Sequence, residues 1–284
     1  MPNFPIIDTH LHIWNPSLLP YPWLEGNALL NRPYLLEDYN AAFASANVEA
    51  MVFVQCEADV SAFIQEADWV AEQARVDDRI RAMVAWAPLE KGTAAEADLV
   101  RLKQHDILRG IRRIIQFEVD LEFCLRPDFI EGLRLLPQHG LSFDICIDHR
   151  HMGNVLKLVE QVPEVPMILD HIGKPNIRTA TREPWTAQMR DMAQFPNVVC
   201  KISGVATEAR ADWEPADLHP YLDVAFDAFG FGRTMFGGDW PVALQATQPS
   251  RWIALLDDYL AGTATTDLRA FWRDNAIRTY RLSL

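Results

Sequence analysis

A short run near the start of the chain, IIDTHLHIWN at residues 6–15, places Asp8, His10 and His12 on alternate positions. Alternation is the side-chain period of a β-strand, so this spacing predicts that all three side chains project to one side of a strand. Inside a protein such groups must be hydrogen-bonded, ion-paired or bound to a metal, because leaving them unpaired is costly. The motif therefore predicts a polar site and leaves its chemistry open, since neutral imidazoles serve equally as metal ligands and as hydrogen-bond donors.

Partners for these histidines follow two other apolar runs. LDHIGKP at 169–175 supplies His171, and FGGDWP at 236–241 supplies Asp239. With His10 and His12 they come from three strand ends, and we expect the four side chains to form one site. Three imidazoles and a carboxylate are a credible ligand set for a single zinc ion, with water completing the coordination.

The elements that must position these groups follow from the apolar pattern. Strands covered on both faces appear as short runs rich in Val, Ile, Met and Leu, and such runs lie at 4–8, 50–56, 80–86, 108–115, 141–147, 165–171, 197–203 and 234–239. Amphipathic helical patterns lie between runs, as at Phe63, Ala67, Val70 and Ala74. Strand–helix alternation predicts a parallel sheet, and its repetition predicts an α/β fold, a distorted single-domain (β/α)8 TIM barrel over residues 1–284. An open doubly wound sheet is the competing fold, but no glycine-rich phosphate loop follows the first run.

Segment 14–34 is a long first loop between strand and helix, rich in proline and aromatic residues. Loops that follow the carboxyl end of a strand shape the pocket of a barrel. Three aromatic residues of this loop and one near the last strand could present flat apolar walls to a substrate ring, namely Trp14, Tyr21, Trp23 and Trp240. Ordinary core packing is the alternative for all four.

Polar candidates for binding substrate oxygens lie in and after the fourth and fifth runs. Arg112 and Arg113 offer a guanidinium fork that suits a carboxylate, and Gln116 offers an amide that suits a hydroxyl. Because strand neighbours face opposite sides, only one of the two arginines can face the site. Asp144 is a further candidate for contact with substrate hydroxyls.

Composition limits the partners. The net charge of −13 argues against a nucleic-acid or anionic-membrane partner, since both need a basic surface. The first residues, MPNFPIIDTH, predict no signal peptide, and no apolar run is long enough to span a bilayer. Free core thiols in a reducing cytoplasm are expected because no CxxC pair occurs among the cysteines, which are Cys56, Cys124, Cys146 and Cys200. The sequence leaves the oligomeric state open, a homo-oligomer included.

The ordered motifs resemble the amidohydrolase superfamily, and more narrowly its branch of lactone hydrolases, which includes lactonases of L-fuconolactone, L-rhamnonolactone and 2-pyrone-4,6-dicarboxylate. The resemblance covers most of the chain, through DTHLHIW, YPWL, LRGIRR, IDHRH, LDHIGKP, CKISG, MFGGDWP and FWRDNAIRTYRL. It implies a carboxylic-ester hydrolase whose substrate is a small sugar lactone, an aldono-1,4- or 1,5-lactone.

One feature of the larger superfamily is missing. Two-metal amidohydrolases bridge their ions with a carboxylated lysine or a glutamate on the fourth or fifth strand. The fourth run here contains GIRRI, and the fifth ends in DICIDH without a histidine inside the strand. The resemblance therefore argues against a binuclear centre. It implies either no required cofactor or one divalent ion, zinc or manganese, held by His10, His12, His171 and Asp239.

The same resemblance implies roles for these four residues. Asp239 would act as general base, taking a proton from the attacking water and passing it to the leaving alkoxide. His10, His12 and His171 would polarise the carbonyl or hold an ion that does so. Two alternatives remain open: a zinc-dependent decarboxylase or amide hydrolase of the same superfamily, and a barrel that binds a sugar without catalysis.

The resemblance and the balance of polar groups together indicate the substrate class. Few arginines lie at candidate pocket positions, whereas Glu57, Asp144 and Asp148 supply acceptors. Acceptors suit a neutral substrate rich in hydroxyls, so we expect a sugar lactone and not a dicarboxylate.

Overall fold

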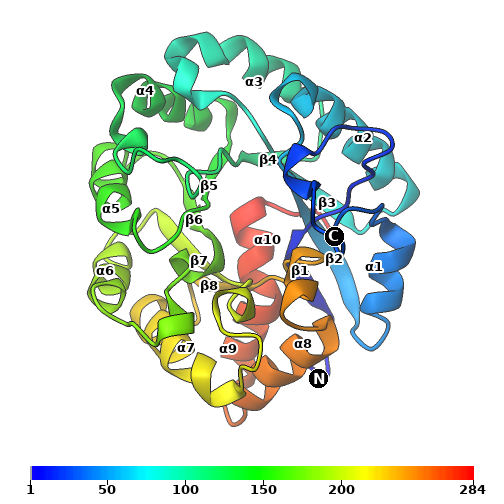
Figure 1. Cartoon of the computed structure of the whole chain (residues 1–284), viewed down its shortest axis with the longest axis vertical. Coiled ribbons are helices and arrows are strands. Elements are labelled where there is room, and N and C mark those ends of the chain that lie inside the picture. Colours follow the sequence, from blue (N-terminus) through cyan, green and yellow to red (C-terminus); the bar gives the residue numbers. More distant parts are fainter. Residues whose placement is uncertain (1) are drawn as a thin grey trace.

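The computed structural model describes residues 2–284 and contains a nearly closed barrel of parallel strands in sequence order (Figure 1). The strands are β1 (Ile6–Leu11), β2 (Val48–Val54), β3 (Ile80–Ala85), β4 (Leu108–Ile111), β5 (Ser142–Ile145), β6 (Met167–Leu169), β7 (Val198–Ile202) and β8 (Thr234–Phe236). Each lies within one predicted apolar run or overlaps it. Backbone hydrogen bonds join β1 to the segment after β8, from His12 N to Trp240 O and from Asp239 N to His10 O, each 2.8 Å long. The predicted (β/α)8 barrel is confirmed.

Helices alternate with the strands and form the outer layer (Figure 1). They are α1 (Leu36–Ala42), α2 (Phe63–Val76), α3 (Glu96–Leu102), α4 (Pro127–Leu135), α5 (Met152–Gln161), α6 (Trp185–Met192), α7 (Pro215–Phe229) and α8 (Pro249–Tyr259). Proline opens α4, α7 and α8, where its missing N–H costs no hydrogen bond. The chain then continues through α9 (Thr265–Arg269), a π-helical turn (Ala270–Asp274) and α10 (Asn275–Tyr280).

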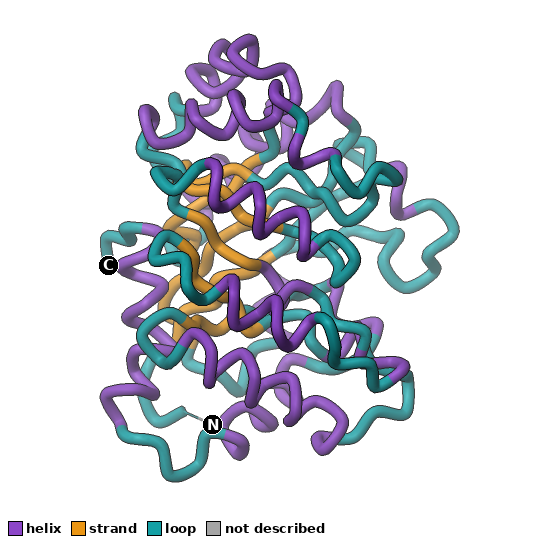
Figure 2. Tube along the Cα trace, turned by 90° about the vertical axis from the view of Figure 1, so that its left-hand side faces the viewer, coloured by secondary structure: helices purple, strands orange, loops and turns teal. Residues whose placement is uncertain are grey.

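The C-terminal helix α10 packs against one end of the barrel. Apolar side chains from the strands form a small interior cluster, and Tyr280 and Leu282 pack into it. The Tyr280 hydroxyl reaches Asp144 of β5 at 2.8 Å. In Figure 2 the C-terminus lies to the left of the strands and the most extended loops lie to the right, so α10 and those loops occupy opposite ends of the barrel. A larger apolar layer lies between the strands and the outer helices.

The predicted long first loop is also confirmed. Residues 14–34 join β1 to α1 and contain one short 3-10 turn, Pro22–Leu24. The backbones of Trp14 and Tyr34 pair at its base, with N–O distances of 3.0 and 2.9 Å. Trp23 Nε1 donates to the carbonyl of Cys56, which follows β2, at 2.7 Å. The loop is thereby fixed against the carboxyl end of the barrel. Across residues 2–284, no helix combines the length and hydropathy that crossing a membrane would need.

Candidate active site

Four side chains from three strand ends meet at the carboxyl end of the barrel. Asp239 Oδ1 lies 3.7 Å from His10 Nε2, 3.6 Å from His12 Nε2 and 4.0 Å from His171 Nε2. The four residues are almost fully buried. The structure therefore brings together the predicted set around a single carboxylate oxygen.

Two of the imidazoles are oriented by a hydrogen bond at the other ring nitrogen. His12 Nδ1 donates to the carbonyl of Val54 at the end of β2, at 2.7 Å. His171 Nδ1 lies 2.9 Å from Ser203 Oγ, just after β7. Each bond holds the ring with its Nε2 toward Asp239, and the bond to Val54 also leaves His12 Nε2 without a proton in the neutral ring.

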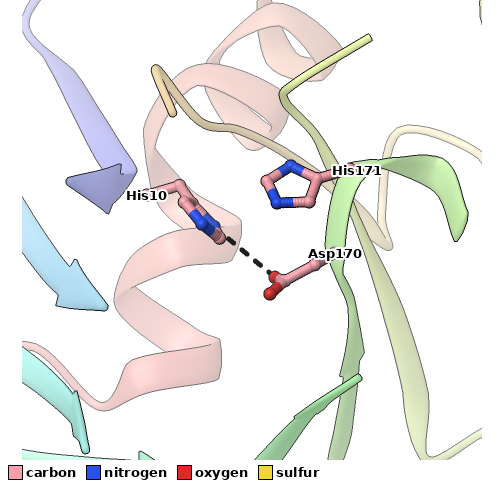
Figure 3. A group of neighbouring side chains, drawn as sticks. All are labelled: His10, Asp170 and His171. Atoms are coloured by element: carbon pink, nitrogen blue, oxygen red, sulfur yellow. Dashed lines mark ion pairs between the residues drawn. The ribbon is translucent and has the colours of Figure 1, made fainter. Parts of the chain in front are cut away.

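His10 lies deepest of the three, with charged neighbours on both ring nitrogens. Its Nδ1 is 3.3 Å from Lys201 Nζ and 3.5 Å from Asp170 Oδ1, and its Nε2 is 3.3 Å from Arg112 Nη1. Figure 3 shows His10 on the segment from β1, facing Asp170 and His171 across the barrel. The His10 ring therefore connects the catalytic candidates, which lie on its cavity side, to a buried charge network on its other side.

The backbone at the site adopts conformations that non-glycine residues rarely use. His171 and Asp239 have φ of +54° and +53°, in the left-handed region. Gly204 after β7 has φ of +59°, and a Cβ there would lie 2.6 Å from His171 Nδ1 and 2.9 Å from Asp239 Oδ2. Only glycine leaves room for both side chains at this position. Such local strain is typical of functional sites.

Asp8 does not share a side of the strand with the histidines, and that prediction is wrong. Its carboxylate accepts from the backbone N–H groups of His10 (3.0 Å) and Gly238 (2.7 Å), and from the hydroxyl of Tyr39 in α1 (3.0 Å). The pairing of β1 with β2 shifts register between Asp8 and Leu11. A bulge of this kind breaks strict alternation, so Asp8 joins β1, the segment after β8 and α1 behind the site.

Burial and neighbouring charges set the protonation of the group. Burial lowers the pKa of His12, and it holds the pKa values of His10 and His171 well below the usual range. Burial alone would raise the pKa of Asp239, but the adjacent His171 and His12 bring it below its ordinary value. At neutral pH the site consists of neutral imidazoles around an ionised carboxylate.

Below His10 lies a network of buried charges. Lys201 of β7 is fully buried, and its Nζ lies 2.6 Å from Asp144 Oδ2 and 3.0 Å from Asp170 Oδ1. Burial alone would lower the pKa of Lys201, but the two carboxylates raise it, so the ammonium stays charged. Arg112 Nη1 approaches the other oxygen of Asp170 at 3.5 Å, and Tyr280 donates to Asp144. The residue pattern alone assigns Lys201 no role, although a lysine inside an apolar run is itself a signal of a buried charge.

A cavity of about 110 Å³ opens above the histidines, and His12, His171 and Asp239 contribute to its lining. The remaining lining residues are Trp14, Trp23, Cys56, Glu57, Arg112, Ile114, Gln116, Phe117, Cys146, Lys174, Thr207 and Val242. Four predicted substrate-binding residues are among them: Trp14, Trp23, Arg112 and Gln116. The cysteines are all buried and free, as expected, but Cys56 and Cys146 line this cavity in addition to packing in the core.

Four other predicted substrate-binding residues lie outside that lining. Arg113 points away and binds Glu90 (3.2 Å) and Glu118 (2.6 Å), as alternation requires once Arg112 faces inward. Asp144 lies in the network below His10. The other two are aromatic residues packed in the core. Burial and the nearby Glu66 carboxyl raise the pKa of Tyr21, and Trp240 packs edge-on against Tyr34 and Tyr39.

A family model described as amidohydrolase matches residues 7–282 of the chain. The chain belongs to the amidohydrolase family. The resemblance inferred from the motifs is therefore confirmed, and the match extends from β1 to the residues after α10.

Similar proteins include named lactonases. An L-fucono-1,5-lactonase of Burkholderia multivorans is 33% identical over 97% of this amidohydrolase chain and 96% of its own. An L-rhamnono-gamma-lactonase of Scheffersomyces stipitis is 24% identical over 99% of this chain and 100% of its own. A solved Burkholderia multivorans amidohydrolase with bound zinc is 30% identical, covers 99% of this chain and 100% of its own, and superposes with a TM-score of 0.89.

The amidohydrolase site described here also fits a metal ion. His10, His12 and Asp239 have ligand atoms within 4.8 Å of one another, as do His10, Asp170 and His171. Ligands ~2.0–2.1 Å from a tetrahedral zinc lie ~3.3 Å apart, close to the observed Nε2–Oδ1 separations. His12 Nε2, which carries no proton, faces the ionised Asp239 oxygen at 3.6 Å. Because neither of these two hydrogen-bond acceptors can donate to the other, a cation or a water molecule is needed between them.

Proposed function

We propose that this amidohydrolase hydrolyses a sugar-acid lactone, with Asp239 as the general base. The observation that carries the proposal is the ionised Asp239 carboxylate, set among neutral imidazoles at the floor of a cavity. A lactone is a cyclic ester, so its opening needs a base for water, stabilisation of an oxyanion and a proton for the leaving oxygen. The names of the related L-fucono- and L-rhamnonolactonases support the same chemistry.

In this mechanism Asp239 accepts a proton from water as the water attacks the lactone carbonyl, and then returns it to the ring oxygen when the C–O bond breaks. His12 Nε2, as an acceptor, helps to hold that water beside the carboxylate. His171 faces the same point and orients the reacting groups with His10 beneath it. When bound at His10, His12, His171 and Asp239, one zinc or manganese ion would polarise the carbonyl.

Arg112 supplies positive charge near the developing oxyanion. It lines the cavity, and one of its nitrogens, Nη2, donates to the carbonyl of Gln55 at 2.5 Å. Its buried Nε has no acceptor anywhere in residues 2–284. Because this Nε is enclosed by protein, Arg112 acts on the oxyanion through its positive charge and not through a hydrogen bond from that atom.

The test is a screen of aldono-1,4- and 1,5-lactones with a pH indicator, because each ring opening releases a proton. Wild-type protein should acidify the solution well above the spontaneous rate, and Asp239→Asn should not. The screen is repeated after removal of metal by a chelator, with metal content measured by elemental analysis, and after addition of zinc or manganese. No acidification by wild type with any lactone would reject the proposal and favour a decarboxylase, an amide hydrolase or a sugar-binding barrel.

We further propose that residues 1–284 work as one domain in a reducing cytoplasm. The family match over residues 7–282 supports a single unit, and the free buried cysteines are compatible with a reducing compartment.

A further inference from the structure

Two cavity residues outside the histidine group have left-handed backbones. Glu57 follows β2 with φ of +53°, and Lys174 follows β6 with φ of +47°. Both line the cavity. In an eight-stranded barrel β2 and β6 are diametrically opposed, so the backbones of an acidic and a basic residue lie on opposite sides of the cavity. Long side chains rarely adopt this backbone region, and such strain persists where the surrounding structure imposes it.

Glu57 is held so that one carboxylate oxygen is engaged and the other is not. Gln55 Nε2 donates to Glu57 Oε1 at 2.7 Å, and the Glu57 backbone N–H donates to Gln55 Oε1 at 2.6 Å. Within the described chain, no Lys or Arg forms an ion pair with Glu57, and Oε2 accepts no hydrogen bond. This wall therefore offers a hydrogen-bond acceptor that lacks a partner.

Lys174 makes the opposite wall a source of donors. Its Nζ donates to Gln116 Oε1 at 2.6 Å, and no carboxylate of residues 2–284 forms an ion pair with it. Cys146 Sγ also donates to Gln116 Oε1, at 3.5 Å, which fixes the amide with its NH2 free. Two ammonium protons and the amide protons remain for a ligand.

The two walls together match a hydroxylated, uncharged ligand. A hydroxyl can donate to Glu57 and another can accept from Lys174, while the charges of the two walls cancel. The other cavity cation, Arg112, already has Asp170 as a counter-ion. A site with such groups disfavours an analogue that lacks the hydroxyls, because binding would remove water from both walls and return no hydrogen bond.

We propose that Glu57 and Lys174 determine substrate specificity by selecting lactones with ring hydroxyls over unsubstituted lactones. This inference rests on the proposed lactonase function. It assigns the two residues to recognition and not to bond cleavage, so removing either one weakens discrimination between substrates.

The experiment compares Glu57→Gln and Lys174→Met with wild type on two lactones of one ring size, an aldono-1,4-lactone and γ-butyrolactone. Each variant should lower kcat/KM for the aldonolactone about 10–100-fold, mainly through KM, and change it less than about twofold for γ-butyrolactone. Glu72→Gln in α2 and Lys157→Met in α5 remove the same charges at exposed positions and should leave both values unchanged.

The possible outcomes separate the two proposals. An equal loss on both lactones would overturn the specificity proposal and leave the lactonase proposal intact. A wild type inert toward both compounds, and toward the wider lactone screen, would reject both. If a variant folds poorly, calorimetric binding of a hydroxylated and an unsubstituted lactam to folded Asp239→Asn protein gives a second measurement. The hydroxylated lactam must bind at least about tenfold more tightly, and equal affinities would overturn the specificity proposal.

Discussion

The barrel encloses two groups of charged side chains, and His10 touches both. In the lower group, Lys201 is paired with Asp144 and Asp170 at 2.6 and 3.0 Å, and Tyr280 completes the contacts of Asp144. In the upper group, Asp239 lies 3.6–4.0 Å from three neutral imidazoles, which is longer than a hydrogen bond. The lower group is closed off from solvent, whereas His12, His171 and Asp239 of the upper group line a cavity.

The difference shows how one barrel combines rigidity with reactivity. A buried charge network with its partners in place holds its members in fixed positions, and removing one partner leaves an uncompensated charge. In the upper group, hydrogen-bond acceptors face one another across an open space. These acceptors can still bind water, a metal ion or a substrate. We infer that the lower group positions His10 and that the upper group does the chemistry.

The largest expected effect is on turnover. Asp239→Asn removes the base while keeping the size of the side chain, so kcat on an aldonolactone should fall by ~10²–10⁴. The melting temperature should change by only a few degrees. Steady-state kinetics and calorimetry check the two parts, and a variant that keeps full activity would remove Asp239 from the mechanism.

The lower group should respond in the opposite way. Lys201→Met leaves Asp144 and Asp170 without their ammonium, and we expect the free energy of unfolding to fall by about 3–5 kcal/mol. Urea denaturation measures this loss, with the exposed Lys157→Met as the matched control. A loss below about 0.5 kcal/mol would show that the network is not the rigid base described above.

Glu66 extends the comparison to a buried carboxyl that forms no ion pair with any cation of residues 2–284. It accepts from the Cys56 backbone N–H at 3.1 Å, and burial raises its pKa from 4.5 to about 8. Between these values the unfolded chain releases a proton that the folded chain retains, so stability falls as pH rises, by about 5 kcal/mol in full. Glu66→Gln should abolish most of this fall. Denaturation of both proteins at pH 5 and pH 8 checks it, and identical pH dependence would contradict it.

The smallest expected effect concerns Arg113, one of the two adjacent arginines that follow β4. Arg113 pairs with Glu90 and Glu118 outside the cavity, so Arg113→Ala should change kcat/KM less than about twofold. Arg112→Ala, one position away, should lower it by about 10²-fold because Arg112 lines the cavity. Kinetics on the same lactone compares them, and equal effects would mean that the cavity does not distinguish the two sides of the strand.

Local patterns were sufficient for the frame of the molecule. Each apolar run predicted a strand because burial on both faces leaves a direct mark on composition, and strand–helix alternation predicted the barrel. His10, His12, His171 and Asp239 could be grouped because parallel strands of a barrel end on one face. The side on which Arg113 lies followed from alternation once one arginine was placed.

The sequence alone thus determined the barrel, its functional end and the four residues that meet there, since each depends on order and periodicity along the chain. The tertiary structure decided the rest. A bulge turned Asp8 away from the histidines, packing took Tyr21 and Trp240 out of the cavity lining, and Lys201 paired with Asp144. These outcomes depend on distances between strands and on backbone conformation at single residues, and neither is recorded in the spacing of residue types.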